Sequence, residues 1–136
     1  MEQNEASRRD RVYIDDAVMD IYKALTEDPN PEQSPFATYK DIFLLAACLG
    51  FQHGRRKQLS SGARTTIRLD VFREEGLGLL KALAIADTGD VAVLQKLGDV
   101  LTIAEEYAHA GIYDLKAQLL DERGRPLWNL VGLLTS

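Results

Sequence analysis

Cysteine and histidine are scarce in this chain of 136 residues, which contains one Cys and two His. The single cysteine, Cys48, excludes an internal disulfide, and one cysteine with two histidines supplies too few ligands for a zinc cluster. Cys48 lies within the apolar run 42–49, so we interpret it as a small core residue. We therefore expect neither a bound metal nor another cofactor.

Long apolar segments are also missing. The run 42–49 is far shorter than the roughly 20 residues needed to cross a bilayer, so no membrane role is expected. The first ten residues lack the apolar centre of a secretory signal, which favours a cytoplasmic protein. Hydrophobic residues make up 46% of the chain, enough for a folded core, and the length fits one domain. We expect a flexible N-terminus over 1–10 and a single helical domain over 11–136.

The sequence contains no complete catalytic pattern. Glu106 and His109 form a Glu-x-x-His pair, but a di-iron site needs a second such pair, and the other histidine, His53, lies on a glycine-flanked loop. We interpret His109 as a side chain near a helix end that interacts with the helix dipole. No nucleophile lies beside a base, and no glycine-rich phosphate loop is present. We predict no catalytic residues and no enzyme. The alternative that the sequence leaves is catalysis by a pair of carboxylates that converge in the fold.

Hydrophobic periodicity predicts a mainly α fold, a compact bundle of about five helices. Thr38 and Asp41 resemble a capping box at the start of a buried central helix, which Gly50 and Gly54 are expected to end. Asp70 and Asp90 are candidate N-caps for two later helices. The other helices are expected over 14–27, 71–86, 91–109 and 112–120, with a break at Ala110–Gly111 and a last apolar element over 127–134. Residues 12–14 and 65–69 alternate in polarity and are compatible with a short two-stranded β element.

Acidic residues are absent from the segment 42–69, which carries five cations. The local charge of +5 leaves −10 for the remainder, because the whole chain has a net charge of −5. Guanidinium groups match phosphate geometry, so these cations are candidate nucleic-acid contacts. Alternatively, they pair with carboxylates of the protein itself or of a partner. They are Arg55, Arg56, Lys57, Arg64 and Arg68. Arg8, Arg9 and Arg11 would extend a basic face if the fold brings them close.

The C-terminal element is apolar on too many sides for an exposed tail. It either closes the core of the domain or contacts a partner. The candidate partner-binding residues are Leu127, Trp128, Leu130, Val131 and Leu134.

Three segments together resemble one protein family. They are Phe36-x-Thr38-Tyr39-Lys40-Asp41 leading into Ala46-Ala47-x-Leu49-Gly50-Phe51 and Gly54-x-Arg56, then Ile67-x-Leu69-x-Val71-Phe72, and Glu105-Glu106-Tyr107-Ala108-x-x-Gly111. The chain resembles, over roughly residues 11–120, the Dnd system-associated protein four family, which is encoded beside bacterial DNA phosphorothioation genes. The family pattern favours Asn-Gly-Gly at positions 109–111, a departure that weakens a metal role for His109.

The resemblance implies a non-catalytic accessory or adaptor subunit of an antiphage or restriction system linked to DNA phosphorothioation. Inserting sulfur into DNA requires cysteine and iron–sulfur chemistry, which this chain cannot supply alone. Its expected partners are therefore larger protein subunits of the same system, and homo-oligomers stay open. The alternative is an accessory protein that contacts DNA phosphates directly through the 55–68 basic loop.

Overall fold

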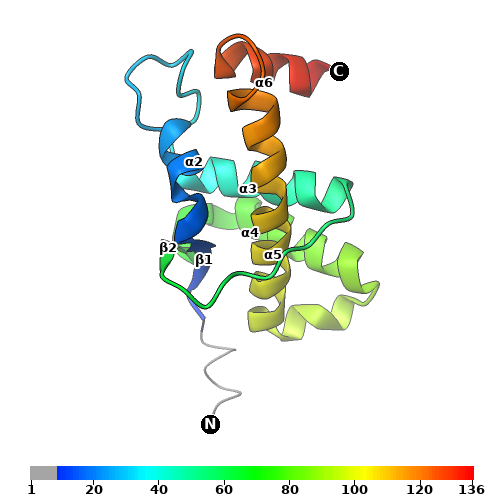
Figure 1. The fold of residues 1–136 in the computed structure, drawn as a ribbon. Helices are drawn as coiled ribbons and strands as arrows, with labels where there is room; N and C mark the ends of the chain where they lie inside the picture. Colours follow the sequence, from blue (N-terminus) through cyan, green and yellow to red (C-terminus); the bar gives the residue numbers. More distant parts are fainter. Residues whose placement is uncertain (1–8) are drawn as a thin grey trace.

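The computed structural model describes residues 9–136, in which α-helices pack together and a two-stranded antiparallel ribbon lies at one side of them (Figure 1). This confirms the predicted mainly α fold with a short β element. The strands are β1 (Arg11–Asp15) and β2 (Arg64–Arg68), and the α-helices are α2 (Met19–Ala24), α3 (Tyr39–Gln52), α4 (Leu69–Thr88), α5 (Leu97–Leu115) and α6 (Pro126–Thr135). Shorter 3-10 or π-helical segments are η1 (Asp16–Val18), η2 (Val91–Gln95) and η3 (Lys116–Leu120).

Helices α3 and α5 pack together through direct backbone contact at two glycines. A Cβ atom on Gly111 would lie 1.7 Å from the Ala46 carbonyl oxygen, and one on Gly50 would lie 2.1 Å from the Tyr107 carbonyl oxygen. The expectation that Gly50 ends its helix and that Gly111 breaks the next was wrong. Both helices continue past these positions because glycine here permits close approach, and Gly54, with φ of +65°, follows the end of α3 instead.

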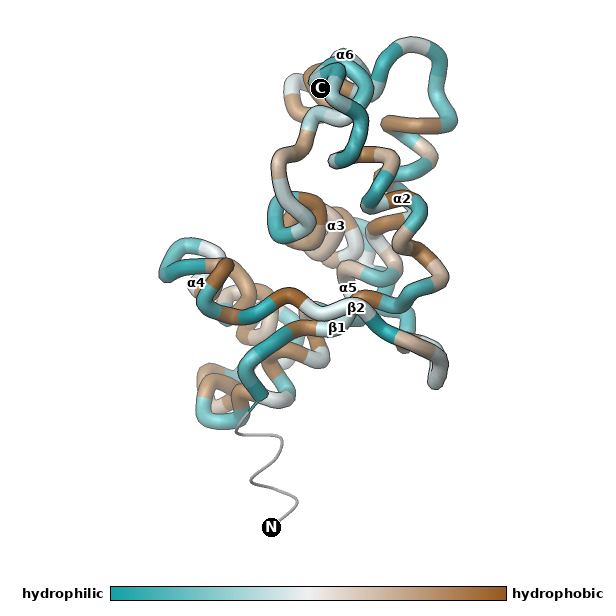
Figure 2. The backbone as a smooth tube through the Cα atoms, turned by 90° about the vertical axis from the view of Figure 1, so that its left-hand side faces the viewer, coloured by the Kyte–Doolittle hydropathy of each residue, from teal (hydrophilic) through white to brown (hydrophobic). Residues whose placement is uncertain are grey.

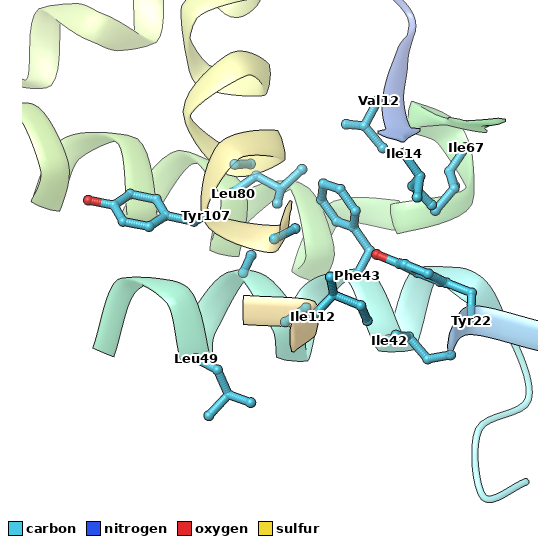
Figure 3. Close-up of a cluster of buried hydrophobic side chains, with 14 of the residues drawn as sticks. Val12, Ile14, Tyr22, Ile42, Phe43, Leu49, Ile67, Leu80, Tyr107 and Ile112 are labelled. Atoms are coloured by element: carbon cyan, nitrogen blue, oxygen red, sulfur yellow. The ribbon is translucent and has the colours of Figure 1, made fainter. Parts of the chain in front are cut away.

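The N-terminus of α3 confirms the predicted cap. The Thr38 hydroxyl accepts a hydrogen bond from the Asp41 amide at 3.4 Å and donates to the Asp41 carboxylate at 3.0 Å. The helix then buries Ile42 and Phe43 in the core (Figure 3). Phe43 meets Phe72 there edge to face, with ring centroids 5.7 Å apart. Cys48 is only half-buried, so it belongs to the margin of this core rather than its centre.

The ribbon covers one end of the core. Its register places Val12 opposite Ile67, and both side chains are buried together with Ile14 (Figure 3). This confirms the predicted strands. Helical structure begins only at Asp16, later than expected, because the strand uses residues 14 and 15. Asp15 caps the first helical turn by accepting a hydrogen bond from the Ala17 amide at 3.0 Å.

In the segment after the ribbon, the structure corrects two predicted helix caps and the predicted start of one helix. Arg68, not Asp70, is the N-cap of α4, and the helix is kinked at Arg73, where φ is +60°. Asp90 does act as a cap, but of the 3-10 segment η2, where it accepts from the Ala92 amide at 2.9 Å. The long helix α5 begins at Leu97 rather than 91.

Candidate functional sites

The middle of the acid-free segment forms a strap, residues 53–63, that crosses α5 between α3 and β2 (Figure 1). Arg56 ties this strap to two helices. Its guanidinium contacts the Glu106 carboxylate through Nε at 3.1 Å and Nη2 at 2.9 Å, and the Asp87 carboxylate through Nη1 at 3.0 Å. Arg55 pairs with Asp114 at 3.0 Å. For these two arginines, the alternative of pairing with the protein's own carboxylates is therefore observed.

The Arg56 network includes a tyrosine. Tyr107 donates its hydroxyl to Asp87 at 2.5 Å, and Arg56 lies over the Tyr107 ring at 5.6 Å. Burial and the hydrogen bond to Asp87 raise the Tyr107 pKa to about 12, so the phenol keeps its proton at neutral pH. The network thus joins the strap, the end of α4 and the middle of α5.

The other three predicted cations lie apart from that network. Lys57 lies over the Tyr113 ring at 5.5 Å, and its amide donates to the Glu106 carbonyl. Arg64 and Arg68 stand at the two ends of β2, where Arg64 lies over the Tyr13 ring at 5.5 Å and Arg68 pairs with Asp70 at 2.8 Å. The fold therefore divides the five cations between the strap and the ribbon.

Two further arginines join the ribbon. Arg11 lies directly opposite Arg68 across the strands, and Arg9 contacts the Glu105 carboxylate and lies over the Tyr13 ring at 4.7 Å. The sequence offered them only as a conditional addition, because their approach depends on strand pairing. Residues 1–8, including Arg8 and most of the expected flexible segment, lie outside the described residues, whereas Arg9 is held against α5.

The predicted partner-binding residues lie on α6, which stands at the end of α5 (Figure 1). Exposed fractions are 60% for Trp128, 42% for Val131 and 65% for Leu134, and together they define the α6 face. Leu127 and Leu130 are half-buried.

Helix α6 is fixed to the domain largely by hydrogen bonds. The Trp128 indole N–H donates to the Glu32 carboxylate at 2.9 Å, the Leu127 amide donates to the Glu32 carbonyl at 2.9 Å, and Asn129 Nδ2 donates to the Leu119 carbonyl at 3.1 Å. Leu130 and Leu133 add partial apolar packing. Sequence reasoning did not identify Glu32, since a glutamate between two prolines carries no signal of a distant contact.

His109 is buried in the middle of α5, so its assignment to a helix end was wrong. Its Nε2 lies 3.9 Å from the Asp15 carboxylate, and its ring meets Tyr113 at 5.9 Å. Burial lowers the pKa of His109, while Asp15 opposes that shift. The Asp15 carboxylate also accepts from the Ser60 amide at 2.8 Å, so it links β1 to the strap.

Metal-binding geometry is not assembled in the part of the chain that the structure describes. Among residues 9–136, no group of three or more His, Cys, Asp or Glu side chains converges as a metal site. Burial raises the pKa of the Cys48 thiol, which keeps it protonated and weakly nucleophilic. No described helix has the length and apolar character of a bilayer span.

The fold and its surfaces thus define a mainly α domain with two exposed features, an arginine-bearing ribbon and an apolar C-terminal helix. The chain belongs to the family described as DNA sulphur modification system-associated protein 4, whose model matches residues 11–136. The resemblance seen in the sequence is therefore confirmed, and the protein is associated with a DNA sulphur modification system. Comparison with curated proteins and with solved structures gives no match.

Proposed function

We propose that the protein is a non-catalytic accessory subunit that binds a larger protein of its DNA sulphur modification system through the α6 face. The system's output would be antiphage defence or restriction, in the cytoplasm. The observation that supports this proposal most strongly is that a helix without a charged residue leaves Trp128, Val131 and Leu134 in solvent. Apolar side chains at this spacing suit docking of a helix in an apolar groove.

The hydrogen bonds of α6 explain why this exposure can be tolerated. Glu32 and Leu119 fix the position of the helix, so its free face is presented in one orientation before a partner arrives. Pre-organisation of this kind reduces the entropy lost on binding. An aromatic residue at the centre of an interface is also a frequent source of binding energy, which favours Trp128 as the anchor.

Co-expression tests this proposal. The tagged chain is produced with each larger protein of the system in turn, and complexes are identified by size-exclusion chromatography. The variant V131N/L134N should abolish the complex. V91N should retain it, because Val91 is 68% exposed but lies on η2, at the opposite end of the molecule from α6 (Figure 1). Retention of the complex by V131N/L134N would contradict the proposal. A chain that self-associates through α6 would identify a second copy as its occupant.

Direct contact with DNA is the second candidate function, and one observation favours it. The fold gathers Arg64 and Arg68 with Arg9 and Arg11 on one ribbon, although they are distant in sequence. Binding of the full chain to a labelled duplex should weaken steeply as salt rises, because each phosphate contact releases counterions. Neutralising Arg55 and Lys57 tests the contribution of the strap, and Arg56 is left intact because it joins three elements.

A further inference from the structure

The side of the ribbon that faces away from the core carries polar and charged residues. Val12, Ile14 and Ile67 point into the core, so the alternating residues lie on the other side of the ribbon. On that side Asp15 is buried beneath the strap and Tyr13 is half-buried beneath the Arg9 and Arg64 guanidiniums, whereas the arginines and Thr66 reach solvent. In Figure 2 no other segment lies in front of the two strands. The residues of this side that reach solvent form what we call the ribbon face: Arg11, Arg64, Thr66 and Arg68.

Two arginines on this face oppose each other directly. Arg11 is the cross-strand neighbour of Arg68, and like charges in this position are unfavourable in a sheet. Each contacts a neighbouring carboxylate, Arg11 with Asp10 at 2.9 Å and Arg68 with Asp70 at 2.8 Å. These carboxylates are 72% and 65% exposed, so water can solvate them if the arginines turn to another anion.

We propose that the ribbon face enters the major groove of duplex DNA, with Arg11 and Arg68 on one phosphate wall and Arg64 on the other. This inference rests on the second candidate function above. A strand rise of about 3.4 Å per residue places Arg64 and Arg68 about 14 Å apart, close to the groove width of about 12 Å. Thr66 is exposed at the middle of β2 and would face base edges.

The ribbon suits this role better than the strap does. Asp87, Glu106 and Asp114, the partners of the strap arginines, are only 15–20% exposed, so turning Arg55 or Arg56 to a phosphate would leave poorly solvated carboxylates behind. Antiparallel two-stranded ribbons fit the major groove, and guanidinium forks match phosphate oxygens. Membership of a family associated with DNA sulphur modification favours DNA over an acidic polypeptide.

The test is fluorescence anisotropy of a labelled duplex of about 20 base pairs, titrated with the full chain between about 50 and 200 mM salt. The variant R11Q/R68Q should bind at least about tenfold more weakly, and its log–log salt slope should be shallower by about 1.8, the value for two lost phosphate contacts. The matched variant R55Q/K57Q removes the same charge from the strap and should behave as the wild type. Circular dichroism confirms that each variant is folded.

Three results would overturn the inference. If R55Q/K57Q loses affinity while R11Q/R68Q keeps the wild-type slope, the ribbon is not the site, but the DNA-contact function stands. If the wild type does not bind the duplex at about 50 mM salt, both statements about DNA fail, and the accessory-subunit proposal is unaffected. If polyglutamate displaces the duplex at equal charge concentration, the ribbon face is a surface for acidic polypeptides.

Discussion

At the scale of residues, the close packing of α3 and α5 requires that residue 111 has no Cβ atom. A Cβ atom there would overlap the Ala46 carbonyl, and backbone atoms cannot move aside as a flexible side chain can. We predict that G111A destabilises the protein by about 3 kcal/mol, at the upper end of the cost of overpacking. The exposed Gly132 is the matched control, because a Cβ there meets nothing within 4 Å. G132A should stabilise α6 by up to about 1 kcal/mol through helix propensity alone.

Chemical denaturation of both variants measures these changes in the free energy of unfolding. Equal and small effects would show that α3 and α5 are farther apart than described. Gly50 and Gly111 also explain why sequence alone misplaced the ends of α3 and α5. Glycine ends helices and also permits close packing, and the two uses differ only in what lies opposite, which a single sequence does not reveal.

At the scale of elements, Arg56 joins the strap to both α4 and α5 through ion pairs. We predict that R56A lowers the free energy of unfolding by about 1–2 kcal/mol, because it breaks charge-assisted hydrogen bonds to both Asp87 and Glu106. R55A should change it by less than about 0.5 kcal/mol, since Arg55 is 64% exposed and makes one pair. Urea titration compares them, and equal losses would contradict a special role for Arg56.

Asp15 makes the junction between β1, η1 and the strap dependent on pH. The Ala17 amide, followed by the Ser60 amide, lowers the pKa of Asp15 from 3.8 to about 2 despite its burial. The unfolded chain therefore binds the proton more readily, so the stability contributed by Asp15 is present above about pH 4 and disappears as pH falls toward 2. The lowered pKa of His109 acts in the same direction, with stability lost as pH falls below about 6.5.

The matching prediction concerns D15N. At about pH 7 it should be less stable than the wild type by up to about 2 kcal/mol, and the difference should shrink as the pH approaches the folded-state pKa of Asp15. Urea denaturation at about pH 7, 5 and 3 measures this difference. A difference that stays constant over that range would mean that the Asp15 carboxylate is not specifically stabilised in the folded state.

The sequence predicted elements better than it predicted their boundaries. The capping residues Thr38 and Asp41, the alternating strands and the buried α3 are local patterns, and the structure confirms them. The position of His109, the start of α5 and the anchor at Glu32 depend on contacts between distant segments. Pairing of Arg55 and Arg56 with acids on α4 and α5 could be stated from sequence only as one alternative, because the partners lie 31 to 59 residues away.

At the scale of the whole molecule, the α6 face and the ribbon are separate surfaces. The α6 face stands at one end of α5, and the ribbon lies beside the middle of that helix (Figure 1). One subunit can therefore contact a protein through the first surface while the second remains free for DNA. The apolar variant V131N/L134N should accordingly leave the duplex affinity of the chain unchanged, and R11Q/R68Q should leave its protein complex intact, as measured by anisotropy and size exclusion.

The most direct test of the accessory-subunit account is amide hydrogen exchange of the full chain, alone and in complex with the larger protein that co-purifies with it. In the free chain, the amides of 131–135 should exchange quickly, because this end of α6 is largely exposed. The account predicts at least about tenfold slower exchange there in the complex, with Val91–Gln95 unchanged as an internal reference. Unchanged exchange in α6, with protection elsewhere, would contradict it.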